Sequence, residues 1–150
     1  MLDLTLAFAH HLLAFGLLAL LVAELMLLSA ALDAAKLALL GRIDMAFGIA
    51  AGLILVVGFS RAVFAEKGWL YYSHNLAFWA KLAVFLVIGL LSIRPTLRFI
   101  AWQRGGAALP SAGEVAAVRR LVWAELALFA LLPLLAAAMA RGYGELEIAQ

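Results

Sequence analysis

Four long apolar runs dominate the sequence and constrain what the chain can fold into. They extend from about Leu6 to Ala31, Ile43 to Ala65, Leu76 to Ile93 and Leu121 to Ala140. A helix needs about 20 apolar residues to cross the roughly 30 Å hydrocarbon core of a bilayer, and each run comes close to or exceeds that length. We therefore predict an all-α fold over residues 1–150, a single-domain, four-helix transmembrane bundle.

The amino-acid composition excludes a soluble protein. Of the 150 residues, 68% are hydrophobic and 13% are charged, and the mean hydropathy is +1.11. A soluble domain is about half apolar and about a quarter charged, so this chain has too few polar residues to cover a surface in water. The chain contains no cysteine, which excludes disulfides and thiolate metal sites. Its eleven Lys and Arg residues flank the apolar runs and do not indicate nucleic-acid binding.

The distribution of positive charge predicts the orientation in the membrane. In a four-span chain, the first and third connectors lie on one side, and both termini lie with the second connector on the other. The first side holds seven basic residues, namely Lys36, Arg42, Arg94, Arg98, Arg104, Arg119 and Arg120. The second side holds three, namely Arg61, Lys67 and Arg141. Because basic residues are retained in the cytoplasm, both termini are predicted on the outer side.

Three short connectors join the apolar runs. They extend from Leu32 to Arg42, from Glu66 to Asn75 and from Arg94 to Arg120. Pro95 is expected to end or kink the third helix, because proline removes a backbone donor and clashes with the preceding turn. Pro133 lies inside the fourth run, where a kink is tolerated in a membrane helix.

Ionisable residues inside the runs are the candidate functional groups, because a charge at mid-span costs roughly 2.5–3.5 kcal/mol. His10 and His11 lie near the outer end of the first run, and His74 opens the third run on the same side. Lys81 follows seven residues later, on nearly the same helical stripe. An imidazole nitrogen can bind haem iron or another metal, and bundle interiors hold such ligands. His10 and His74 are therefore candidate cofactor and metal ligands, with His11 as a further candidate.

These residues also have a structural interpretation. His74 fits an interfacial loop, and His10 fits a hydrogen bond to a neighbouring helix while His11 faces lipid headgroups. One residue of slip rotates a helix by about 100°, so the sequence does not decide which of the two histidines faces inward. Lys81 fits either a side chain that extends to the membrane surface or a partner for a porphyrin carboxylate.

Glu24 and Glu125 form a second layer, close to the basic residues of the cytoplasmic side, namely Arg42, Arg119 and Arg120. The favoured interpretation is a set of interhelical ion pairs that fix the packing. The alternative is a proton or cation path with Glu24 as its deepest group. Asp44, beside Arg42, is interpreted as a residue at the membrane boundary.

Helix packing offers a further signal. Gly48-Ile-Ala-Ala-Gly52 places two glycines four residues apart, a pattern that allows close contact between helices. Besides the lipid bilayer, a homo-oligomer is therefore a candidate partner. A quinone held between the first and third helices, or a larger membrane complex, are others.

Several segments resemble a family of small four-span bacterial inner-membrane proteins that are classed as a domain of unknown function. The resemblance rests on Ala9-His-His-Leu12, Phe64-Ala-Glu-Lys-Gly68, Phe78-Trp-Ala-Lys-Leu82 and the stretch from Gly89 to Phe99. It covers most of the chain, and it implies the same topology in a bacterial inner (plasma) membrane, with both termini periplasmic. It implies no activity.

More distantly, the chain resembles the HemJ-type protoporphyrinogen oxidases and the copper-resistance D-type membrane domains. The HemJ-type proteins carry a haem-binding His early in their first helix and a Trp-x-x-Lys-Leu-like pattern in a later helix, whose Lys matters for activity. His10 and Lys81 occupy these two positions. The resemblance implies haem b as a cofactor, His10 as its ligand and Lys81 as a catalytic residue. Where the HemJ-type proteins have a Pro-Arg pair, this chain has Val22-Ala-Glu24-Leu.

Two functions of different classes follow. The first is a small integral membrane protein that binds haem b near the outer face, is redox-linked and, if it is an enzyme, acts as a HemJ-like membrane oxidoreductase. The second is a non-enzymatic channel or transporter subunit, or an assembly partner without a cofactor. Absorbance of the purified protein separates them.

Overall fold

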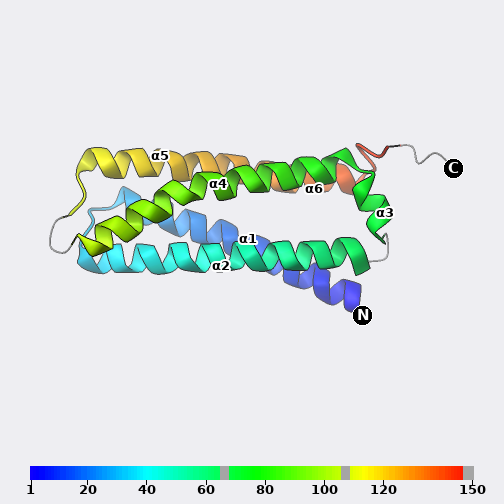
Figure 1. Cartoon of the computed structure of the whole chain (residues 1–150), viewed down its shortest axis with the longest axis horizontal. Coiled ribbons are helices and arrows are strands. Elements are labelled where there is room, and N and C mark those ends of the chain that lie inside the picture. The colour runs from blue at the N-terminus through cyan, green and yellow to red at the C-terminus, as the bar shows by residue number, and fades with distance from the viewer. Residues whose placement is uncertain (65–67, 106–108, 147–150) are drawn as a thin grey trace.

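A computed structural model describes residues 1–64, 68–105 and 109–146, and these residues form a bundle of long helices (Figure 1). The helices are α1 (Leu2–Ser29), α2 (Ala34–Phe64), α3 (Gly68–Ser73), α4 (Leu76–Arg104), α5 (Ala112–Phe129) and α6 (Leu131–Ala140). Four helical segments are long and apolar enough to cross a membrane, with α5 and α6 together forming the fourth. The predicted four-span all-α fold is confirmed. Ala65, Glu66, Lys67 and Gly106, which the sequence assigned to a span end or to connectors, lie outside the described residues.

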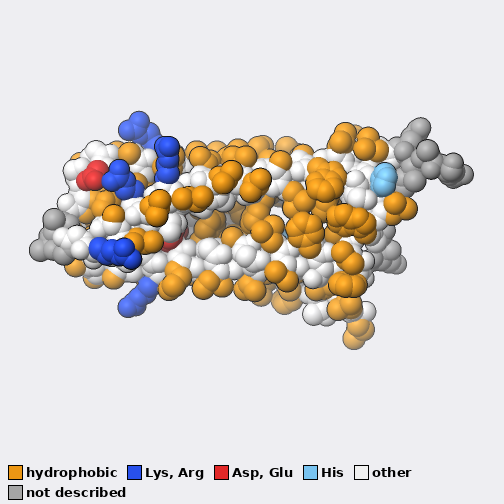
Figure 2. Space-filling view, viewed as in Figure 1, with side chains coloured by type: hydrophobic (Ala, Val, Ile, Leu, Met, Phe, Trp, Pro, Cys, Tyr) orange, Lys and Arg blue, Asp and Glu red, His pale blue; other side chains and the backbone are white. Residues whose placement is uncertain are grey.

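The spans pack as a ring in which α1 contacts α2 and α5, and α4 contacts α2, α5 and α6. The turns α1–α2 and α4–α5 lie at one end of the bundle, and both termini lie with α3 at the other (Figure 1). We call these the basic end and the terminal end, because on the face seen in Figure 2 the Lys and Arg side chains gather beside the two turns. Most of the remaining surface of that face is hydrophobic, as contact with lipid tails requires.

Helix α1 is buried only in its half towards the basic end. The buried residues of α1 are Leu17, Leu21, Glu24, Leu25 and Leu28, and none precedes Leu17. In α6 only Leu132 is buried. Within the described residues α1 makes no close contact with α6, and in Figure 1 the N-terminal half of α1 diverges from α4 and α6. Among the described residues α1 therefore packs against α2 and α5 and not against α6.

The two helix prolines behave differently. Pro95 lies inside α4, which continues nine residues further to Arg104, so of the two expected outcomes, an end or a kink, the end of the helix is contradicted. Pro95 is buried against neighbouring helices, and their packing holds the helix together where a single backbone hydrogen bond is lost. Pro133 has no N–H to offer the carbonyl of Phe129, the last residue of α5, and the helix is interrupted at Ala130. This interruption lies three residues before Pro133, in the region where the sequence predicts a kink.

Local hydrogen bonds fix where the helices begin. Asp33 Oδ1 accepts the backbone N–H of Lys36 at 2.8 Å, and this bond lowers the pKa of the Asp33 carboxyl. Ser111 and Glu114 form a reciprocal capping box at the start of α5. Asn75 Oδ1 accepts the backbone N–H groups of Ala77 and Phe78 at the start of α4.

The terminal end is closed by short segments that the apolar runs did not predict. Helix α3 interrupts what the sequence presented as a simple connector. After α6 the chain turns back, so that Gly144 O accepts the N–H of Leu76 at 2.8 Å and His74 O accepts the N–H of Leu146 at 2.8 Å. Gly144 has a φ of +83°, and a Cβ there would lie 3.2 Å from the backbone N of Ala77. The close approach of these two backbone segments therefore requires glycine.

Candidate functional site

Ionisable side chains gather in the bundle interior in two separate groups. The interior basic cluster consists of His10 on α1, Arg61 on α2 and Lys81 on α4, towards the terminal end. The interior carboxyl cluster consists of Glu24 on α1, Asp44 on α2 and Glu125 on α5, towards the basic end. Each cluster combines residues of three helices, so each exists only in the folded bundle.

His10 is the centre of the interior basic cluster. Its ring lies against Gly58 of α2, where an added Cβ would be 3.4 Å from its Cε1. Its Nδ1 is buried and has no hydrogen-bond partner among the described residues. Lys81 and Arg61 are both close enough to act on the ring electrostatically. His10 is therefore a half-buried imidazole with a free nitrogen in a positively charged surrounding.

Arg61 and Lys81 supply that charge. Arg61 lies in the last turn of α2, and its Nε is buried without an acceptor. Lys81 lies five residues after the start of α4, half-buried, and feels the charge of Arg61. Within the part of the chain that the structure describes, no acidic side chain forms an ion pair with either residue. The cluster is thus a concentration of positive charge that lacks a counterion of its own.

The other two histidines do not enter the bundle interior, although the ring of His11 lies 6.3 Å from that of His10. His11 is exposed, and its Nδ1 lies 2.7 Å from the carbonyl oxygen of Ala7 in the same helix. His74 lies in the turn between α3 and α4, where its Nδ1 is 3.0 Å from Leu70 O and 3.1 Å from Ser73 Oγ. No hydrogen bond or ring contact joins His10 and His74 within the described residues. Of the three histidines, His10 is the one that faces the bundle interior.

The interior carboxyl cluster occupies positions where each helix otherwise presents apolar residues to the core. Glu24 stands in the buried stripe Leu17–Leu21–Glu24–Leu28, and Glu125 in the equivalent stripe Val118–Val122–Glu125–Phe129. Asp44 stands between Leu40 and Phe47 in α2. The exposed fractions are 2% for Glu24, 1% for Glu125 and 8% for Asp44. Asp44, which the sequence placed at the membrane boundary, is turned into the core of the bundle by the packing of α2.

Within the described residues, the ion pairs predicted for Glu24 and Glu125 are not formed. One oxygen of each carboxyl, Oε1, is buried without a hydrogen-bond partner. Among the described residues the ion pairs join Lys36 to Asp33 at 3.5 Å and Arg98 to Glu114 at 3.7 Å, all near the surface. Arg42 and Arg120 are exposed, since basic side chains at a span end reach water at little cost, whereas the two carboxyls point inward.

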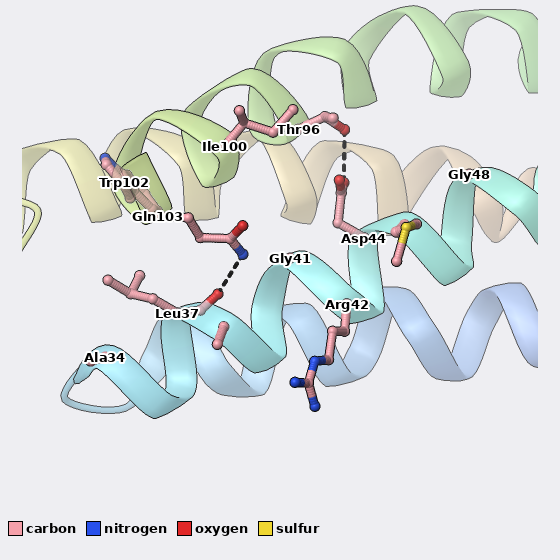
Figure 3. A pocket seen from close by; sticks show the side chains of 12 residues that line it. Ala34, Leu37, Gly41, Arg42, Asp44, Gly48, Thr96, Ile100, Trp102 and Gln103 are labelled. Atoms are coloured by element: carbon pink, nitrogen blue, oxygen red, sulfur yellow. Dashed lines mark hydrogen bonds between the residues drawn. The ribbon is translucent and has the colours of Figure 1, made fainter. Parts of the chain in front are cut away.

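A groove between α2 and α4 leads to the interior carboxyl cluster (Figure 3). Its volume is about 680 Å³, and Asp44 and Thr96 lie in its lining. Thr96 Oγ1 donates a hydrogen bond of 2.7 Å to Asp44 Oδ1. Nearer the basic end, the amide of Gln103 lies over Gly41 and donates to Leu37 O at 2.9 Å. The groove thus connects the basic end with a carboxyl that has a fixed donor.

No group of three or more His, Asp or Glu side chains within residues 1–64, 68–105 and 109–146 is arranged to hold a metal ion. The carboxyls of the interior cluster act on one another electrostatically but do not converge on a common point. The interior carboxyl cluster therefore has the chemistry to bind protons. The interior basic cluster has the chemistry to bind an anionic group, beside one imidazole.

Residues 2–144 match the model of a family described as predicted membrane proteins, DUF2214. The chain belongs to this family. Its function is unknown, which agrees with the resemblance drawn from the sequence. No curated protein and no solved structure matches the chain.

The matched range includes all six residues of the two clusters, because it extends through every span. Sequence reasoning gave little weight to two of these residues, Arg61 and Asp44. Both lie near span ends, where charged residues are usual. A signal for Asp44 was present, because it lies four residues after Leu40 and three before Phe47 on one helical face.

Proposed function

We propose that the protein binds haem b in the half of the bundle towards the terminal end, where His10 would bind the iron. The observation that carries the proposal is the unpartnered, half-buried His10 imidazole within reach of two cationic side chains. Haem b offers iron for an imidazole nitrogen and two propionate carboxylates for cations. Bound haem would supply one-electron redox chemistry, which makes the protein a redox-linked membrane protein.

Lys81 and Arg61 are the partners of the propionates in this proposal. Two cations without a counterion cost free energy in the bilayer, and two carboxylates offset that cost. Arg61 belongs to α2 and Lys81 to α4, so the two cations would hold the ligand between these helices. Lys81 is the residue that the distant resemblance associates with activity, and here it positions the ligand. His74, which is occupied by hydrogen bonds of its own turn, has no part in the proposal.

Entry of an apolar ring is supported by the packing. Towards the terminal end, α1 contacts α2 but not α6, and no residue of α1 before Leu17 is buried. Gly58 leaves room for the His10 ring beside α2. A flat, mostly apolar ligand that partitions into the bilayer can reach His10 from the lipid, between α1 and α6.

The orientation belongs to the same proposal. Seven Lys and Arg residues belong to the two turns and adjoining helix ends at the basic end. By the rule that positive charge stays in the cytoplasm, the terminal end faces the periplasm of a bacterial inner membrane, with both termini there. The haem would then lie near the outer face.

Absorbance tests the proposal. Protein purified in detergent from a haem-replete host should show a Soret band, and His10→Ala should abolish it. His11→Ala is the matched control, because it removes the adjacent exposed imidazole and should leave the band unchanged. Lys81→Gln should weaken haem binding about 10- to 150-fold, the equivalent of one charge-assisted hydrogen bond of roughly 1.5–3 kcal/mol.

A preparation that is colourless and stays colourless on titration with haemin would overturn the haem proposal. That result would favour a membrane component without a cofactor, such as a channel or transporter subunit or an assembly partner. Mass spectrometry of the extracted lipids would then identify a quinone or an acidic lipid held by the same cations.

A further inference from the structure

The interior carboxyl cluster has no part in the proposed haem site. Glu24 of α1, Asp44 of α2 and Glu125 of α5 lie towards the other end of the bundle, and each takes a place in its helix that core packing would give to an apolar side chain. Nothing in the packing of the neighbouring leucines and valines requires a carboxyl there. Their chemistry needs an explanation of its own.

Within the described residues, no cation forms an ion pair with the interior carboxyl cluster. Helix α1 contributes no cation near Glu24, because its histidines lie at the terminal end. Among the cations of α2, α4 and α5 near this depth, Lys36 pairs with Asp33 and Arg98 with Glu114, and no ion pair joins any of them to the cluster within the described residues. These cations are Lys36, Arg42, Arg94, Arg98, Arg119 and Arg120. The cluster therefore consists of three acids and one neutral donor, Thr96.

The unpartnered oxygens of Glu24 and Glu125 are a second observation, independent of the acidic character of the cluster. Both side chains are at least 98% buried, and Oε1 of each has no donor within reach in the described structure. An ionised carboxylate without a partner in such a place costs several kcal/mol, and a neighbouring negative charge adds to the cost. A bound proton removes both costs. A metal ion is not favoured, because the described side chains do not converge as metal ligands.

We propose that the interior carboxyl cluster is a proton-binding site, in which Glu24 and Glu125 hold exchangeable protons and Asp44 connects them to the groove between α2 and α4. Asp44 belongs both to the interior carboxyl cluster and to the lining of the groove. It lines the groove together with Thr96, and it acts electrostatically on both glutamates. Thr96 holds Asp44 by a 2.7 Å hydrogen bond, so one oxygen of Asp44 is fixed. Protons reach the two glutamates from the basic end through Asp44.

Labelling with dicyclohexylcarbodiimide tests this proposal on the purified full chain in lipid nanodiscs. The apolar reagent reacts with a carboxyl that carries its proton: the proton moves to a reagent nitrogen while the carboxyl oxygen bonds to the central carbon, and rearrangement leaves a stable acylurea. We expect peptide mass spectrometry to find the label on Glu24 or Glu125. The labelling should decrease as pH rises, because the protons are lost. Glu114, an exposed carboxyl near the same end, is the internal control and should stay unlabelled.

Two variants sharpen the test. Glu24→Gln and Glu125→Gln each remove one acceptor of the label while they retain the side-chain volume, and loss of label at the substituted position is expected. The result on the native chain decides the matter even if a variant fails to fold. Absence of label on both glutamates across the pH range, in protein that remains helical, would overturn the proposal. Suppression of the label by sodium ions at constant pH would overturn it as well, because the ligand would then be a metal cation. Neither outcome depends on haem, so this proposal and the haem proposal fail separately.

Discussion

Replacing Glu125 by leucine is expected to stabilise the folded bundle. Glu125 lies between Val122 and Phe129 on the buried face of α5, with 1% of its surface exposed and one oxygen unpartnered. Leucine has a similar length and no polar atom. The substitution therefore removes an unsatisfied polar group from the core without removing its packing.

The magnitude follows from the missing hydrogen bond. A buried polar group without a partner costs about 1–3 kcal/mol, and Glu125→Leu should raise the free energy of unfolding by an amount in this range. For a chain of this size, about 1 kcal/mol corresponds to roughly 2–4 °C in Tm. If Glu125 instead formed an ion pair inside the bundle, removal of one partner would cost about 3–5 kcal/mol. The two arrangements thus predict opposite signs.

Unfolding by sodium dodecyl sulfate in mixed micelles, followed by circular dichroism, measures the sign. Val122→Ala is the matched control, because it lies one turn earlier on the same face, is fully buried and should lower stability through lost packing. The reasoning would be refuted if Glu125→Leu lowered the free energy of unfolding by more than about 1 kcal/mol while Val122→Ala was also destabilising. A loss of that size exceeds the error of roughly 0.5 kcal/mol expected for independent sites. A stabilised variant would mean that the carboxyl is retained for its chemistry.

Three further outcomes are expected. Thr96→Val leaves Asp44 without its donor and should lower the free energy of unfolding by about 1–3 kcal/mol in the same assay, and an unchanged value would contradict the hydrogen bond. Gly58→Leu places a side chain where the His10 ring lies, so it should abolish the Soret band while the helix content is retained; a normal band would show that the ring does not depend on this space. Gly144→Ala forces a left-handed backbone on a residue with a Cβ, at about 1–2 kcal/mol, and should speed hydrogen exchange at the first amide of α4; protection as in the native chain would count against the docking of the C-terminal segment.

The number of spans and their approximate positions could be predicted from the apolar runs alone. The residues at which the helices end could not be predicted, because α2 and α4 extend through charged residues, such as Arg42 and Arg98, that the sequence assigned to connectors. Helices continue beyond the hydrocarbon core wherever a partner helix supports them. Pro95 illustrates this, since packing retains the helix across a residue that would end an isolated one.

The interior faces were harder to predict, for a physical reason. In lipid, both the core and the outer surface of a helix are apolar, so apolar periodicity does not distinguish them. Polar residues alone mark the interior, and this is why His10, Lys81, Glu24 and Glu125 could be selected as candidates from the sequence. The residues that these side chains contact could not be predicted. Contacts between helices depend on the rotation of each helix about its axis, and an error of one residue changes that rotation by about 100°. The choice of His10 over His11 required the structure.

The separation of the two clusters along the bundle has a consequence for a membrane under voltage. His10 and Glu24 lie fourteen residues apart on α1, about 21 Å at 1.5 Å per residue. That is about two thirds of a hydrocarbon core of roughly 30 Å. Moving one elementary charge across the whole core against a membrane potential of 100 mV costs about 2.3 kcal/mol. Moving a proton from one cluster to the other would change its electrostatic energy by about two thirds of that, or about 1.5 kcal/mol. Any chemistry that links the two ends of this bundle is therefore sensitive to the energised state of the membrane.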